Sequence, residues 1–210
     1  MLQSAASRPV LRRTHDRKEP PSMKILALQG SPRTDGNTAA MLDLIEKHLD
    51  GVHTFERIDL VDSDVSGCHS CYECQHVPDT HGCAVEDDGQ QILDKVLEAD
   101  AIIYATPLYM WGITSWLRAI MERHLSLVMG YMTGDWNSLI EGKQVALLVT
   151  AGGPEEDNAD AVQTVFQRFA DYGKARSLGT YIVPLCTTPE ELGEKGMETA
   201  KRLASEIAAA

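Results

Sequence analysis

Residues 23–38 read MKILALQGSPRTDGNT and join an uninterrupted apolar run to a loop of small, polar and glycine residues. The run from Ile25 to Leu28 is typical of a strand that is covered on both faces in a parallel sheet. The loop leads directly into a stretch with apolar residues at helical spacing, Met41, Ile45 and Leu49. Residues 23–49 therefore predict one unit of strand, loop and helix.

The same unit repeats along the chain. The apolar runs 101–105 and 145–149 predict central strands, while 52–60 suits an outer strand and 180–183, closed by Pro184, the last strand. Helical spacing recurs between and after them, at Ile92/Val96, Trp116/Ile120/His124/Leu127, Val162/Val165/Phe166/Phe169 and Ala200/Leu203/Ile207. With right-handed crossovers, residues 23–210 are expected to form one α/β domain, a doubly wound five-stranded parallel sheet with helices on both faces.

Composition limits the partners. The chain has 210 residues, with 19 Lys and Arg against 31 Asp and Glu, giving a net charge of −12. We expect neither a nucleic-acid nor an anionic-membrane partner, because both need a basic face. Residues 1–22 are richer in basic residues and predict a disordered or upstream-start extension. Because Thr14 to Ser22 is polar where an export signal needs an apolar segment, a cytoplasmic location is expected.

Ligands of a doubly wound sheet bind beyond the carboxyl ends of its strands, where the loop 30–38 lies. Hydroxyl groups, one guanidinium and the N–H groups of a helix start are suited to holding a phosphate. The loop lacks the lysine and the glycine spacing of a Walker A loop and the G-x-G-x-x-G fingerprint, so a single phosphomonoester fits better than a pyrophosphate. The alternative is a plain turn with a helix cap. The candidate phosphate-binding residues are Ser31, Arg33, Gly36, Asn37 and Thr38.

Two further loops follow central strands. The loop after residues 101–105 is rich in aromatic residues, and the loop after residues 145–149 contains two glycines that let the backbone approach a ligand. Together these loops could surround a flat, mostly apolar ring such as a flavin. The alternative for Tyr109 and Trp111 is packing in a core or a subunit interface. The candidate residues are Pro107, Leu108, Tyr109, Met110, Trp111, Gly112, Ala151, Gly152 and Gly153.

These loops, with residues 117–123 (LRAIMER), make the chain from Met23 onward resemble the flavodoxin-like, NAD(P)H-dependent FMN reductases. The resemblance implies a flavodoxin-like fold in which the first loop holds the FMN phosphate and the other two embrace the isoalloxazine. It also implies NAD(P)H as an electron donor and a homodimer or homotetramer with flavin sites near the subunit contacts.

A cysteine-rich insert at 62–88 distinguishes this chain. The insert contains four of the five cysteines of the chain, Cys68, Cys71, Cys74 and Cys83. A C-x2-C-x2-C run with a further cysteine matches the ligand spacing of [4Fe–4S] loops. The insert resembles the iron–sulfur flavoprotein branch of the same family, which carries such a cluster beside FMN. Zinc, with His69, His76 or His81 as further ligands, and cysteines without metal remain the alternatives. The fifth cysteine, Cys186, is expected to be a buried apolar residue.

The predicted function is that of an iron–sulfur flavoprotein oxidoreductase, an enzyme. Electrons would pass from NAD(P)H or ferredoxin through FMN and a [4Fe–4S] cluster to a small acceptor such as a quinone, an oxygen species or a nitro or azo compound. The alternatives are a non-catalytic electron carrier and a cluster-free quinone reductase. No side chain is assigned a catalytic role: His124 is expected in the core, and the acidic residues 86–88 precede a helix that they can stabilise. Backbone N–H groups of 107–112 and 151–153 are expected to stabilise reduced flavin.

Overall fold

The computed structural model describes residues 22–49, 51–77 and 79–209. The extension predicted at 1–22 lies outside these residues, apart from Ser22. Among the described helices, none is long and apolar enough to cross a membrane.

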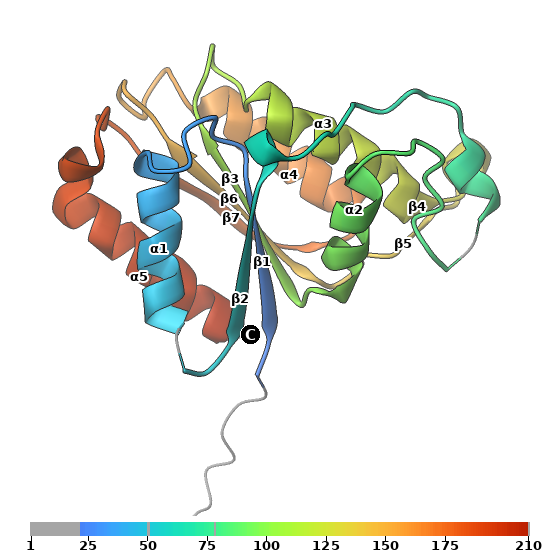
Figure 1. The fold of residues 1–210 in the computed structure, drawn as a ribbon, viewed down its shortest axis with the longest axis horizontal. Helices are drawn as coiled ribbons and strands as arrows, with labels where there is room; N and C mark the ends of the chain where they lie inside the picture. Colours follow the sequence, from blue (N-terminus) through green and yellow to red (C-terminus); the bar gives the residue numbers. More distant parts are fainter. Residues whose placement is uncertain (1–21, 50, 78, 210) are drawn as a thin grey trace, which may run out of the picture.

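Five parallel strands form the centre of the molecule, in the order β2-β1-β3-β6-β7 (Figure 1). This is the strand order of the flavodoxin-like folds and confirms the predicted fold class. The central strands β1, β3 and β6 are almost entirely buried, as their uninterrupted apolar sequences predict. The strands are β1 (Lys24–Gln29), β2 (Thr54–Asp59), β3 (Ala101–Pro107), β6 (Gln144–Thr150) and β7 (Arg176–Val183).

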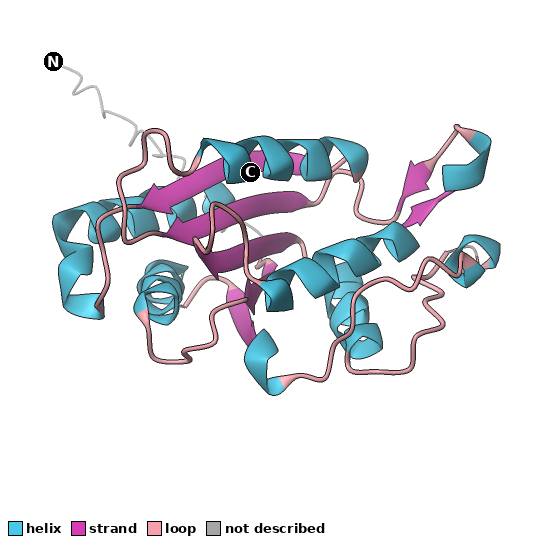
Figure 2. Ribbon diagram, turned by 90° about the horizontal axis from the view of Figure 1, so that it is seen from above, coloured by secondary structure: helices cyan, strands magenta, loops and turns pink. Residues whose placement is uncertain are grey.

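Helices cover both faces of this sheet (Figure 2). Helices α1 (Asn37–Leu49) and α5 (Gly193–Ala208) pack on one face, over residues such as Ile25 and Ile103. Helices α2 (Gly89–Glu98), α3 (Ser115–Arg123) and α4 (Asp160–Tyr172) pack on the other, over Leu26 and Tyr104. Alternating residues of each central strand thus enter two different cores, which produces the three-layer arrangement.

The last strand, predicted at 180–183, begins four residues earlier, at Arg176. The structure also departs from the predicted elements after α3. The helix predicted through Leu127 ends at Arg123 and continues as a 3-10 helix, η3 (His124–Leu127). The chain then forms a two-stranded antiparallel ribbon, β4 (Val128–Met129) and β5 (Asn137–Ser138), that was not predicted. The other short helices are η1 (Leu60–Asp62), η2 (Glu73–His76), η4 (Tyr131–Thr133) and η5 (Pro189–Leu192).

Gly30 fixes the geometry at the carboxyl ends of β1 and β3. Its N–H donates to Ala105 O at 2.7 Å, and its carbonyl accepts from Thr114 Oγ1 at 2.6 Å. A Cβ at position 30 would lie 2.7 Å from both Leu117 Cβ and Thr114 Oγ1. Only glycine therefore allows the loop after β1 to approach the start of α3 this closely.

His124 is a core residue, 4% exposed, as expected from its place on the apolar face. Its Nδ1 lies 2.8 Å from Ile120 O, and its Nε2 lies 2.8 Å from the Tyr104 hydroxyl. Because the carbonyl can only accept, Nδ1 carries the proton and Nε2 accepts from Tyr104. Burial lowers the pKa of His124 from 6.5 to about 4.

This low pKa predicts a pH-dependent stability. In the unfolded chain His124 takes up a proton below pH 6.5, whereas in the folded chain it does so only below about pH 4. The free energy of unfolding should therefore fall as the pH drops through this window, by about 3 kcal/mol in total from this group. Urea unfolding of wild type and His124→Gln between pH 4 and 8 should show a flatter profile for the variant. The exposed His48→Gln should keep the wild-type slope, and equal slopes for all three proteins would contradict the assignment.

Candidate functional site

Three loops at the carboxyl ends of β1, β3 and β6 line one open cavity of about 290 Å³. A second pocket of about 190 Å³ adjoins it and shares Leu108 and Gly152. The two pockets bring together all the predicted flavin-site residues except Gly36 and Gly112. The first is lined by Ser31, Arg33, Asn37, Thr38, Pro107, Leu108, Tyr109, Thr150, Gly152, Cys186 and Thr187; the second by Leu108, Met110, Trp111, Ala151, Gly152, Gly153 and Asn158.

The loop after β1 forms a polar, cationic end of the first cavity. Helix α1 begins at Asn37, and within the described residues the backbone N–H groups of 37–39 have no hydrogen-bond partner. The hydroxyl of Ser31 is buried and accepts from Arg33 N at 3.1 Å, while the Arg33 side chain is exposed at the rim. Free N–H groups at a helix start beside an arginine fit a phosphate dianion.

The Asn37 side chain joins α1 to a distant segment and does not cap the helix. Its Nδ2 donates to Cys186 O at 2.9 Å, which ties α1 to the segment after β7. Its buried Oδ1 has no partner among the described residues. Thr38 and Thr150 share a hydrogen bond of 2.9 Å between their hydroxyls, so β6 also supports this end of the cavity.

Thr150, Cys186, Thr187 and Asn158 are lining residues that the sequence did not reveal. Thr150 is the last residue of β6, so its position at a strand end was a usable signal. Cys186 is buried, as predicted, and burial raises the pKa of its thiol.

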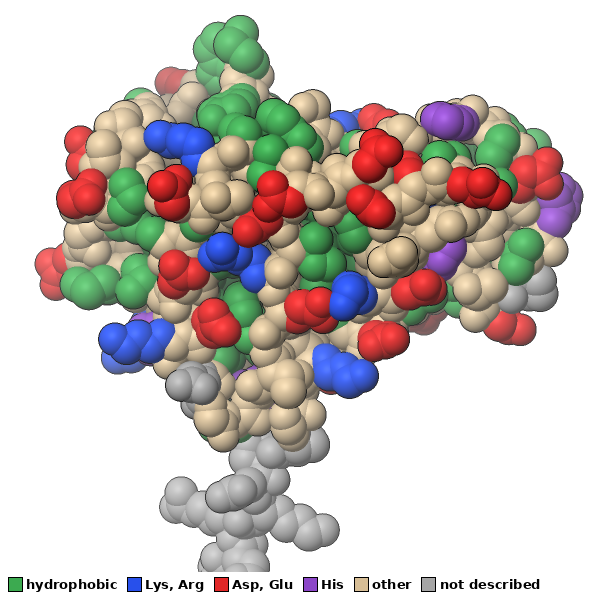
Figure 3. All heavy atoms as spheres, in the orientation of Figure 1, with side chains coloured by type: hydrophobic (Ala, Val, Ile, Leu, Met, Phe, Trp, Pro, Cys, Tyr) green, Lys and Arg blue, Asp and Glu red, His purple; other side chains and the backbone are tan. Residues whose placement is uncertain are grey.

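The loop after β3 is a tight hairpin. Tyr109 and Gly112 exchange two backbone hydrogen bonds of 3.0 Å, and the residues between them have positive φ angles, 49° at Met110 and 59° at Trp111. Two successive positive φ values are the mark of a type I′ turn, which normally takes glycine or asparagine. Met110 and Trp111 are also 85% and 59% exposed, and apolar side chains protrude from the loop between β3 and α3 (Figure 3). A strained, exposed aromatic turn at a ligand cavity is typical of a functional loop.

Backbone hydrogen bonds within the protein reduce the number of N–H groups that these two loops could offer to a flavin. Leu108 N donates to Thr150 O at 2.8 Å and Ala151 N to Val183 O at 2.9 Å, so these N–H groups are already used. Within the described residues, the N–H groups of Met110, Trp111, Gly152 and Gly153 have no partner. They are therefore the candidates to bond the polar edge of a flavin.

A third, small cavity is lined by Cys68, Cys71, Cys74 and Cys83. The insert that carries them extends away from the sheet, beside α3 and the β4–β5 ribbon (Figure 1). Gln75 fastens it there, because its Nε2 donates to Val128 O at 2.8 Å and its Oε1 accepts from Tyr131 N at 3.1 Å. The fold therefore gathers the four predicted ligands, although Cys83 comes nine residues after Cys74.

The cysteine cavity has the donor chemistry of a metal site. Burial raises the pKa of the Cys74 thiol, and the three other cysteines raise it further. A hydrogen bond from Gln75 lowers this pKa but does not cancel the effect of burial. In the part of the chain that the structure describes, no group of three or more His, Cys, Asp or Glu side chains is arranged with metal-binding geometry. Four thiols around one cavity fit an iron–sulfur cluster by donor type.

The sequence analysis did not identify Arg123, a large and fully buried side chain that also lines this cavity. It forms an ion pair with Asp87, one of the acidic residues expected only to stabilise a helix start. The two residues are far apart in the sequence, so no local pattern of residues predicts this ion pair.

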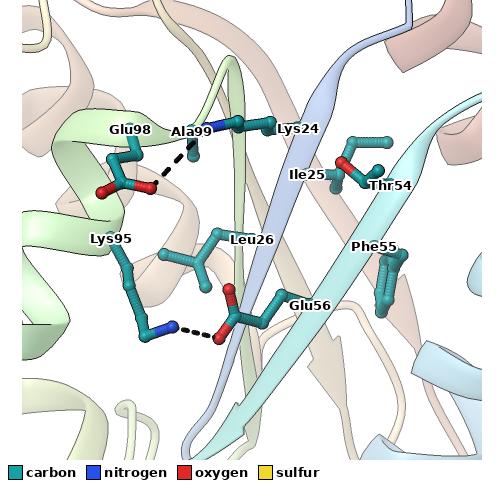
Figure 4. Close-up of a pocket in the computed structure, with 9 residues that line it drawn as sticks. All are labelled: Lys24, Ile25, Leu26, Thr54, Phe55, Glu56, Lys95, Glu98 and Ala99. Atoms are coloured by element: carbon teal, nitrogen blue, oxygen red, sulfur yellow. Dashed lines mark hydrogen bonds and ion pairs between the residues drawn. The ribbon is translucent and has the colours of Figure 1, made fainter.

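A further pocket of about 220 Å³ lies between α2 and the amino ends of β1 and β2 (Figure 4). Its polar groups are paired with one another, Lys24 with Glu98 and Lys95 with Glu56. It therefore offers few free groups to a ligand and lies at the end of the strands opposite the ligand loops.

The chain is similar to known flavin reductases and iron–sulfur flavoproteins. A family model described as NADPH-dependent FMN reductase matches residues 23–190. An iron–sulfur flavoprotein of Methanocaldococcus jannaschii is 31% identical over 148 residues, 69% of this chain and 72% of that relative. An iron–sulfur flavoprotein of Archaeoglobus fulgidus is 27% identical over 191 residues, 90% of this chain and 80% of that relative. The structure of the NAD(P)H:quinone oxidoreductase from Methanothermobacter marburgensis shares the fold, with a TM-score of 0.68, 17% identity and coverage of 87% of this chain and 98% of that one.

Proposed function

The chain belongs to the NADPH-dependent FMN reductase family, in its iron–sulfur flavoprotein branch, and we propose that it passes electrons through FMN and a [4Fe–4S] cluster to a small acceptor. Family membership makes it an FMN-dependent oxidoreductase that draws electrons from a nicotinamide. The cluster, the acceptor and the use of ferredoxin as a second donor are the proposed part.

One observation carries the proposal. A single chain has a cavity suited to a phosphate at the carboxyl ends of its central strands and a separate cavity lined by four cysteines. A cluster-free quinone reductase would need only the first. When bound, FMN accepts a hydride and releases electrons singly, while the cluster passes one electron at a time. The proposed acceptors are a quinone, an oxygen species or a nitro or azo compound.

The residues of the chain would bind and shield these groups. The N–H groups of 37–39, with Ser31 and Arg33, would hold the FMN phosphate, and those of Met110, Trp111, Gly152 and Gly153 would bond the ring edge. Tyr109 and Trp111 would limit access of water to the ring. Cys68, Cys71, Cys74 and Cys83 would supply the four thiolates.

The proposal predicts the content of protein purified without oxygen. We expect about one FMN, about four iron atoms and about four sulfide ions per chain, with little zinc, together with a broad brown absorbance that bleaches on reduction. NADPH or NADH oxidation should be rapid with a quinone present. A yellow protein with flavin bands and no iron would refute the cluster. Zinc at about one atom per chain would favour a tetrahedral zinc site at the cysteines.

An acidic groove favours a second candidate, an electron carrier that docks with a redox protein. The groove, of about 690 Å³, runs past the exposed Cys71 and includes Asp64, Glu73 and Glu86. Asp and Glu side chains also outnumber Lys and Arg on the face in Figure 3. Fast reduction by ferredoxin without turnover of any pyridine nucleotide would support the carrier over the reductase.

A further inference from the structure

Arg123 stands out because its guanidinium is completely enclosed. Its side chain is 0% exposed, at the carboxyl end of α3, and its ion-pair partner Asp87 is 8% exposed. Removing an arginine from water is strongly unfavourable unless its donors are satisfied and its charge is paired. The surroundings of Arg123 are arranged to do both.

Every nitrogen of this guanidinium donates to the cysteine insert. Nε donates to Cys83 Sγ at 3.0 Å, Nη1 to the Asp87 carboxylate at 2.8 and 2.9 Å, and Nη2 to Val85 O at 3.2 Å. Nη1 also lies 3.3 Å from Ser66 O. Ser66 precedes the first cysteine of the insert, whereas Cys83, Val85 and Asp87 follow at its end, so one side chain fastens both ends.

Asp87 completes this fastening. Its Oδ2 accepts from Ser66 N at 2.9 Å and from Ser66 Oγ at 3.0 Å, and its Oδ1 accepts from Gly89 N at 2.9 Å. A Cβ at position 89 would lie 2.8 Å from Asp87 Oδ1 and 3.0 Å from Arg123 Nη1. The start of α2 is therefore packed against the ion pair without room for a side chain.

Resting on the proposed cluster, we propose that Arg123 is a positioning residue that holds Cys83 as the fourth ligand and, with Asp87, sets the reduction potential of the cluster. Arg123 lines the cysteine cavity, and its N–H points at the one cysteine outside the C-x2-C-x2-C run. An N–H donor fixes the orientation of the sulfur. A buried positive charge also stabilises the reduced cluster, which carries one more negative charge than the oxidised cluster, and salt screens it little.

The sign of the effect separates this role from a purely structural one. Arg123→Gln removes the positive charge and should lower the ratio of reduced to oxidised cluster at a fixed solution potential by about tenfold, which is about 59 mV for a one-electron couple. Asp87→Asn removes the nearby negative charge and should raise that ratio. Arg123→Lys keeps the charge but not the planar set of donors, so its potential should stay near wild type while iron retention falls.

The experiment uses the FMN-loaded protein, purified and titrated without oxygen, with the cluster followed by its absorbance and electron paramagnetic resonance. Arg118→Gln is the matched control, because Arg118 is an exposed arginine of the same helix paired with Glu122. We expect its potential and iron content to match wild type. If Arg123→Gln is too unstable to purify, the opposite shift of Asp87→Asn and the iron loss of Arg123→Lys still test the proposal.

Three results would overturn it in distinguishable ways. Wild-type protein with a cluster, but with the same potential and iron content in all three variants, would refute the role of Arg123 and leave the proposed function standing. Wild-type protein that holds no iron would refute the proposed cluster and this inference together. Shifts of equal sign in Arg123→Gln and Asp87→Asn would show a structural role and not an electrostatic one.

Discussion

Replacing Cys74 by serine should leave a yellow protein that has lost its iron. Cys74 is 7% exposed and is the most enclosed of the four cysteines in the cavity, so a serine there removes a thiolate that water cannot replace. A cluster with three cysteine ligands is labile, and we expect iron to fall from about four atoms per chain to less than about one. Metal analysis and the visible spectrum of the anaerobically purified variant measure the change.

The chain offers a matched control in Cys186, which is also buried but lies at the flavin cavity. Cys186→Ser should keep its iron, and Cys74→Ser should keep about one FMN because the flavin loops do not include Cys74. Loss of iron from both variants would point to general instability. Retention of a full cluster by Cys74→Ser would contradict the ligand assignment.

The sheet was predictable because its sequence signal is local. Uninterrupted apolar runs are typical of strands that are covered on both faces of a sheet. Because a helix-spaced segment separates each pair of such runs, a parallel arrangement of the strands is the simplest one. The three flavin loops followed from the same logic, since each comes after a central strand. The spacing of the cysteines predicted the insert, but not its position beside α3.

The features that were missed depend on distant or strained contacts. The two-residue strands β4 and β5 are too short to carry a period, and η3 begins where the last turn of α3 gives way to a tighter one. The hairpin at Met110 and Trp111 contradicts the usual residue preference for its turn, so its sequence predicted only a loop. The pair of Arg123 and Asp87 joins segments that only the folded chain brings together.

Reversing the charge of Arg33 should greatly weaken FMN binding without unfolding the protein. Arg33 is exposed at the rim of the cavity, next to the start of α1. Hydrogen bonds to charged groups contribute about 1.5–3 kcal/mol, and a glutamate would also repel the phosphate dianion. We expect Arg33→Glu to raise the Kd for FMN by about a hundredfold, measured by quenching of flavin fluorescence on titration of FMN-free protein.

Riboflavin, which lacks the phosphate, makes this test specific. Arg33→Glu should bind riboflavin as wild type does, because the proposed ring contacts lie on the hairpin at 109–112 and at Gly152 and Gly153 and not on the loop after β1. Lys47→Glu makes the same charge change at an exposed position near the other end of α1, and its FMN affinity should match wild type. Equal weakening of FMN and riboflavin would place Arg33 at the ring. An unchanged FMN affinity would move the phosphate away from residues 31–38, and with it the orientation proposed for the whole cofactor.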